Sequence, residues 1–199
     1  MQLGVFPLPL VLFPKGVTQL KIFEPRYLRL VKQAASGQGF VLSTYLPDAE
    51  FNTSKLGAWV DIVDFAQRDD GLLIIDICTR DLVEISNIKV EEDGLRVANA
   101  TPVSHWPQAS MCSKARKLSA ALQEIHRSMP EYAKMYPKPE FANPAWVCAR
   151  FVELLPLPVE KKLEFLAPNS FDECLSFLAT IINGENKSDP ITEPARKYS

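Results

Sequence analysis

Apolar and polar residues alternate along much of the first half of the chain, with the two-residue period of β-strands. From Thr18 to Ile22, the apolar residues share one face and the polar residues share the other. Further runs of strand-forming residues cover 40–45, 58–67, 72–79, 82–91 and 95–101, and an exposed loop is expected at 47–55. Asp70-Gly71 and Asp93-Gly94 each separate two such runs. Because this dipeptide tolerates positive φ, the sequence predicts two β-hairpins.

The segment from Phe6 to Tyr27 combines strand, turn and helix signals in one continuous stretch. Its prolines, Pro7, Pro9 and Pro14, remove backbone donors and divide an apolar run into short extended pieces. Pro25 suits the first turn of a helix, and Glu24 places negative charge beside the positive helix end. A helix is therefore expected to begin here, with Phe23 and Tyr27 packed in the core.

The apolar period changes from two towards 3.6 residues after 102–107, which indicates a change from strands to helices. One stripe at three- and four-residue spacing predicts a helix: Met111, Ala115, Leu118, Leu122, Ile125 and Met129. Pro130 ends this helix, and a connection is expected from 131 to 143. Further helices are expected at 144–155, at 159–166 and after the capping-box sequence Ser170–Glu173.

These patterns predict an α+β fold that divides near residue 105. Residues 1–105 are expected to form a β-rich part with one short helix, and residues 106–183 a helical part. Residues 184–199 are polar, contain two prolines and have few apolar side chains to offset the entropy cost of ordering. They are interpreted as a disordered tail.

Composition excludes some classes of function. Of the 199 residues, 47% are hydrophobic and 23% charged, and the net charge of -2 lacks the cationic excess that favours nucleic acids or anionic membranes. No apolar run approaches the roughly 20 residues that a membrane-spanning helix needs. The N-terminus lacks a secretory signal pattern. A cytoplasmic protein without membrane partners is therefore expected, and nucleic-acid binding would need a local basic patch.

The residue types that usually carry catalysis or metal binding are scattered. Four cysteines, Cys78, Cys112, Cys148 and Cys174, form no CxxC pair and are interpreted as small buried hydrophobes in a reducing compartment. His105 and His126 adjoin no recognised nucleophile motif. His126 is expected on the solvent flank of its helix, and His105 is expected to pack beside Trp106. No catalytic residue, metal ligand or cofactor is assigned.

Two groups of side chains are candidates for contact with a polypeptide. Glu24 and Arg26 form an acid–base pair that could orient a peptide, although support of the helix start is the favoured alternative. Tyr132, Met135 and Tyr136 form an aromatic cluster in a proline-rich connection, where simple packing is the favoured alternative.

Several motifs carry a resemblance to a known family. They are FPL at 6–8, LFP at 12–14, IFEPRY at 22–27, Gly57 opening a strand, Asp70-Gly71, LLPL at 154–157 and EKKLE at 160–164. Together they resemble the N-terminal substrate-binding domain family of Lon proteases, from about Met1 to Asn183. This chain departs from the family where Cys78 stands near a usual glycine and Lys162 near a usual glutamine.

The resemblance implies a PUA-like twisted β pseudo-barrel with one short helix, followed by a C-terminal α-helical bundle. It implies a substrate-recognition module for unfolded or damaged polypeptides. The chain has no glycine-rich phosphate loop, and its length leaves no room for the family's ATPase and protease domains. We therefore expect a non-enzymatic polypeptide-binding or adaptor module. A separate ATP-dependent protease and weak self-association are left open as partners, and PUA-like RNA binding and an uncharacterised hydrolase are left open as alternative functions.

Overall fold

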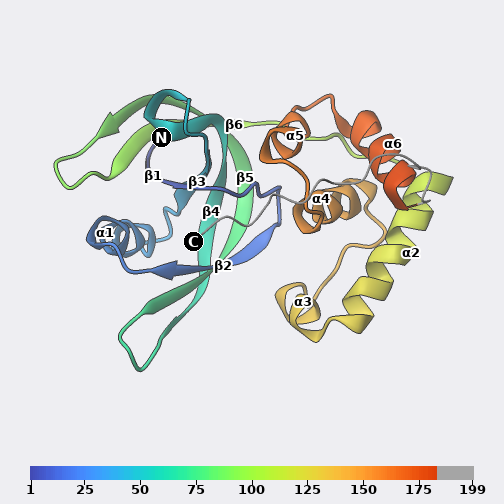
Figure 1. Ribbon diagram of the computed structural model, residues 1–199, viewed down its shortest axis with the longest axis horizontal. Coiled ribbons are helices and arrows are strands. Elements are labelled where there is room, and N and C mark those ends of the chain that lie inside the picture. Colours follow the sequence, from blue (N-terminus) through green and yellow to red (C-terminus); the bar gives the residue numbers. More distant parts are fainter. Residues whose placement is uncertain (183–199) are drawn as a thin grey trace, which may run out of the picture.

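The computed structural model describes residues 1–182, in a mixed α+β fold (Figure 1). The strands are β1 (Gln2–Leu8), β2 (Val17–Ile22), β3 (Phe40–Tyr45), β4 (Thr53–Gln67), β5 (Leu73–Val90) and β6 (Arg96–Val103). The helices are α1 (Pro25–Ala34), the 3₁₀ turn η1 (Glu50–Asn52), α2 (Ser113–Ser128), α3 (Pro130–Met135), α4 (Pro144–Leu154), α5 (Val159–Glu164) and α6 (Phe171–Ile182). The tail expected at 184–199 lies outside the described residues.

The six strands form one sheet in the order β2-β5-β4-β3-β1-β6, and a further pairing of β5 with β6 closes the sheet on itself. The long strand β5 thus has three partners. Ile75 of β5 lies opposite Leu20 of β2 and Phe65 of β4, and further along β5 Ile85 lies opposite Ala100 of β6. β1 and β3 run parallel, whereas the other neighbours are antiparallel.

The expected strands at 72–79 and 82–91 are one strand, so the predicted break between them was wrong. Trp59 pairs with Asp81 and Val60 with Thr79, which leaves Arg80 as an extra residue in a β-bulge. A bulge bends a strand without ending it. The loop expected at 47–55 was also too long, because β4 begins at Thr53 and the turn before it is a 3₁₀ helix.

Both predicted hairpin turns are confirmed. Gly71 has φ 82° and Gly94 has φ 83°, in the left-handed region that favours glycine. In each turn the glycine N–H donates to the carbonyl three residues earlier, Arg68 or Glu91. The hairpin between β4 and β5 extends beyond the rest of the sheet, at the lower left of Figure 1.

The helices follow the predicted apolar stripes closely, with one exception. Pro25 is the first residue of α1, α2 ends at Ser128 just before Pro130, and the Asn143 side chain caps α4 by accepting from the Trp146 N–H at 3.4 Å. The connection expected at 131–143 contains the helix α3. Proline is well tolerated at a helix start, so Pro130 ends one helix and begins the next.

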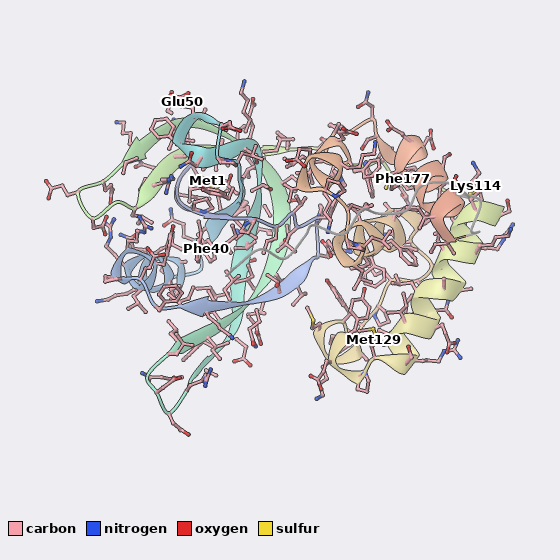
Figure 2. All side chains as sticks on the ribbon, viewed as in Figure 1. Met1, Phe40, Glu50, Lys114, Met129 and Phe177 are labelled. Atoms are coloured by element: carbon pink, nitrogen blue, oxygen red, sulfur yellow. The ribbon has the colours of Figure 1, made fainter. Side chains whose placement is uncertain are left out.

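One hydrophobic cluster runs through the strands and the helices. It includes Phe13 and Phe40 from the strand part and Leu118 and Val152 from α2 and α4. Figure 2 shows Phe40 in the interior of the strand part and Met129 at the end of α2. Because the cluster is continuous, the segment that follows β1 is held in place by helices far along the chain.

Phe23 and Cys112 are placed differently from expectation. Phe23 is 72% exposed, whereas Tyr27 is buried and stacks on Phe6 with ring centroids 3.8 Å apart. Cys112 is exposed and Cys78 half-buried, while the other two cysteines are buried. The expectation of a core position was therefore wrong for Phe23 and Cys112.

Candidate functional site

A groove of about 330 Å³ lies between the segment that joins β1 to β2 and the helices α3, α4 and α5. One wall is formed by 9–12 and the start of β2, and the other by α3, the end of α4 and α5. We call it the α3–α5 groove. A larger hollow of about 540 Å³, between η1 and β5, has mostly polar or charged lining residues. The mainly apolar α3–α5 groove is the better candidate for contact with another molecule's side chains.

The predicted cluster Tyr132, Met135 and Tyr136 lies in this groove. Met135 is 39% exposed, whereas the two tyrosines are only 7% and 6% exposed. The tyrosine rings lie 5.0 Å apart, and Tyr136 meets Trp146 edge-on at 5.7 Å. The tyrosines therefore form a packed wall, and Met135 presents a flexible apolar side chain at its rim.

A buried ion pair between Arg150 and Glu153 stabilises the segments that line the groove. Arg150 is fully buried, and its Nε lies 2.7 Å from Oε2 of Glu153, whose side chain is 12% exposed. A second guanidinium nitrogen donates to Glu153 Oε1 at 2.8 Å and to the Pro14 carbonyl at 3.2 Å. The Phe13 N–H donates to the same carboxylate at 2.8 Å. The pair thus fixes the turn before β2 against α4.

Tyr136 joins this pair to β2. Its hydroxyl donates to Glu153 Oε2 at 3.4 Å and accepts from the Val17 N–H at 3.1 Å. Burial raises the pKa of Tyr136, and the neighbouring Glu153 raises it further, so the hydroxyl keeps its proton.

The two charged members of the network influence each other. Burial raises the pKa of Glu153 above its usual range, although Arg150 and the Phe13 N–H act against this. Burial acts to lower the pKa of Arg150, but the Glu153 carboxylate together with Tyr136 and Tyr132 outweighs this effect, and the pKa is raised. A guanidinium stays protonated in either case, so the buried positive charge requires its carboxylate partner.

The groove opens onto an unpaired strand edge. β2 pairs with β5 alone, in a register that sets Thr18 opposite Ile77 and Leu20 opposite Ile75. The Val17 N–H points away from β5, since it binds the Tyr136 hydroxyl. Because backbone direction alternates along a strand, the N–H and C=O groups of Gln19 and Lys21 also face outward. Among residues 1–182, no other strand covers this edge.

Lys162 of α5 also lines the groove. Its ammonium donates to the Glu153 backbone carbonyl at 3.0 Å. Within the described part of the chain, no carboxylate lies within ion-pair distance of it. Burial lowers the pKa of Lys162, with Glu153 acting in the opposite direction.

Glu24 and Arg26 lie apart from the groove, at the start of α1. They form an ion pair at 2.6 Å, and Arg26 also donates to the Gly94 carbonyl at 3.5 Å. Its guanidinium lies 4.9 Å from the centre of the Tyr27 ring. These contacts join α1 to the turn before β6. A role for the two residues in binding stays a prediction.

Neither histidine lies in the groove. His105 stacks on Trp106 at 4.4 Å and lies 3.3 Å from the Phe165 carbonyl, and burial lowers its pKa to about 4. His126 is half-buried, 2.9 Å from the Tyr136 carbonyl, so its expected place on the solvent flank was wrong. In residues 1–182, no group of three His, Cys, Asp or Glu side chains is arranged to hold a metal ion.

The aromatic residues of the groove could be predicted from the sequence, whereas its other lining residues could not. The backbone of 9–12, the edge of β2 and Lys162 come together only through long-range contacts. Nothing in the sequence near Lys162 predicted that it lines the groove.

The closed six-stranded sheet followed by helices places this chain among mixed α+β domains, and the expected fold class is confirmed at that level. The chain belongs to the ATP-dependent protease La (LON) substrate-binding domain family, whose model matches residues 2–184. The predicted family membership is therefore confirmed. Among the described residues, no helix is both long and apolar enough to cross a membrane.

Two solved structures share the fold. The Lon N-terminal domain protein from Xanthomonas campestris is 25% identical, with 89% of this chain and 96% of that chain covered and a TM-score of 0.72. The N-terminal domain of Mycobacterium avium complex Lon protease is 12% identical, with 94% and 100% covered and a TM-score of 0.60. The second likeness shows the fold alone. A comparison with curated proteins gave no match.

Proposed function

We propose that this chain is a non-enzymatic polypeptide-binding or adaptor module that recognises unfolded or damaged protein segments, without ATP hydrolysis or proteolysis of its own. The observation that carries the proposal is an apolar groove that opens onto an unpaired strand edge. An extended segment would pair its backbone with Gln19 and Lys21 and place apolar side chains in the groove. Backbone pairing requires no particular sequence, as recognition of varied clients demands.

The family membership supports this proposal, because the family is described as substrate-binding. We interpret the closed sheet as the family's PUA-like pseudo-barrel and 106–183 as its helical bundle, with the domain boundary near residue 105. On this interpretation, a separate ATP-dependent protease would receive the bound clients. The mainly apolar groove favours polypeptide over the RNA alternative, which would need cationic side chains for phosphate contacts.

A backbone substitution at Gln19 tests the mode of binding. In Gln19→Pro the outward N–H is lost, whereas pairing with β5 is retained because that N–H does not face β5. The matched control is Gln19→Ala, which loses the side-chain hydrogen bond to Asp76 but keeps the N–H. Fluorescence anisotropy with a labelled, permanently unfolded apolar peptide measures the dissociation constant of each variant.

We expect Gln19→Pro to raise the dissociation constant about fivefold or more, which corresponds to the net free energy of one hydrogen bond. Gln19→Ala should bind like the parent. Equal binding by all three proteins would rule out pairing on β2. A flat response with a panel of denatured proteins would contradict the proposed function itself. Binding to RNA at low salt, with no binding to polypeptides, would favour the RNA alternative.

A further inference from the structure

The lysines of α5 differ in one respect that bears on what the groove binds. Lys161 forms ion pairs with Glu164 at 2.6 Å and with Glu173 at 3.1 Å. Lys162, the next residue, contacts only the Glu153 backbone carbonyl within the described residues. An ammonium has three donors, and the contacts of residues 1–182 use one of them, which leaves two for a ligand. A partly buried cation without a carboxylate partner favours an anionic ligand.

The surroundings of Lys162 restrict the form of that anion. Leu157 and Val159, close to it in the sequence, also line the groove, and both are half-buried. An apolar group must therefore adjoin the negative charge. The Glu153 carboxylate cannot supply the charge, because it is already bound by Arg150 and the Phe13 N–H.

The volume of the groove favours a chain end over a long segment. About 330 Å³ is near the lower limit for small-ligand pockets, which is room for a few residues. A polypeptide C-terminus carries its carboxylate directly beside its last side chain. It therefore supplies the charge and the apolar group together, with no continuing backbone to bury.

We propose that the α3–α5 groove selects polypeptide C-termini that end in apolar residues, with Lys162 binding the terminal carboxylate and Leu157 and Val159 contacting the last side chain. This inference rests on the proposed function and specifies its substrate class. The preceding residues of the client extend past Tyr136 and Met135 towards the edge of β2.

Three peptides of one apolar sequence test the inference on the unmodified protein. The first ends in a free carboxylate, the second in a carboxamide, and the third is a carboxamide with glutamate one position before the end. We expect the free acid to bind about tenfold more tightly than both carboxamides, the size of a charge-assisted hydrogen bond. In Lys162→Gln this preference should be lost, and in Lys162→Arg it should be kept.

Lys161→Gln is the matched control. It also removes one lysine charge from α5, but Lys161 is already paired with two carboxylates. It should keep the tenfold preference, and thermal unfolding checks that each variant is folded. Equal binding of the free acid and the carboxamide by the parent protein would overturn the inference and leave polypeptide binding intact. Equal binding of the glutamate peptide and the free acid would also overturn it. If none of the peptides bound, the proposed function would fail instead.

Discussion

The substitution Glu153→Gln removes the only carboxylate that the described residues place against the buried Arg150. Arg150 has no solvent exposure, and its guanidinium lies 5.3 Å and 5.5 Å from the ring centres of Tyr136 and Trp146. No water can replace the lost partner without entry into this packed region. The amide would also turn its own N–H₂ donor towards one of the groups that now donate a hydrogen bond to Glu153.

An unpaired buried charge costs about 3–5 kcal/mol. A typical domain has only about 5–15 kcal/mol of unfolding free energy, so Glu153→Gln should remove a large part of the total. The matched control is Glu164→Gln on α5, which breaks an exposed pair at the same i,i+3 spacing. Exposed pairs contribute about 0–1 kcal/mol, so the control should unfold almost like the parent.

Equilibrium unfolding in urea, followed by tryptophan fluorescence, measures both free energies. The double variant Arg150→Met with Glu153→Leu should be more stable than Glu153→Gln alone, because it leaves no unpaired charge. A loss below about 1 kcal/mol for Glu153→Gln would mean that residue 153 is neutral in the folded chain. That result would refute the ion-pair reasoning.

Two further predictions concern pH and glycine geometry. Burial lowers the pKa of His105 to about 4, so the unfolded chain takes up a proton below pH 6.5 that the folded chain refuses until about pH 4. Between pH 7.5 and pH 5 the parent should therefore lose up to about 2 kcal/mol more stability than His105→Gln, and equal losses in urea titrations would contradict this. Gly39 and Gly71 both have positive φ, but a Cβ at Gly39 would collide with the Val60 carbonyl, whereas at Gly71 it would meet open space. Gly71→Ala should cost about 1–2 kcal/mol and Gly39→Ala clearly more, and similar melting temperatures for the two would argue against the collision.

Features encoded by neighbouring residues could be predicted from the sequence. The glycines at 71 and 94 determine their turns locally, and Pro25 and Asn143 mark helix starts. The bulge at Arg80 could not be predicted, since it depends on the register of β4 against β5 and on the ion pair of Arg80 with Asp61. Local pattern shows turns and caps, but bulges depend on partners elsewhere in the chain.

The residues that line the α3–α5 groove could likewise be predicted only in part. Aromatic composition indicated Tyr132, Met135 and Tyr136 but gave no means of finding the wall opposite them. Lys162 and the segment 9–12 are about 150 positions apart in the sequence. Phe23 was expected to pack in the core with Tyr27, but the structure places it in solvent after the end of β2.

The hydrogen bond from Phe13 to Glu153 spans 140 positions in the sequence, and it has a consequence for the order of events during synthesis. The strands of the closed sheet leave the ribosome before α4 and α5 exist, so the turn before β2 must wait for the carboxylate that fixes it. Contacts so distant form late in folding. A nascent chain therefore has no α3–α5 groove, and the protein acquires its binding surface only when its helices have been made and have docked.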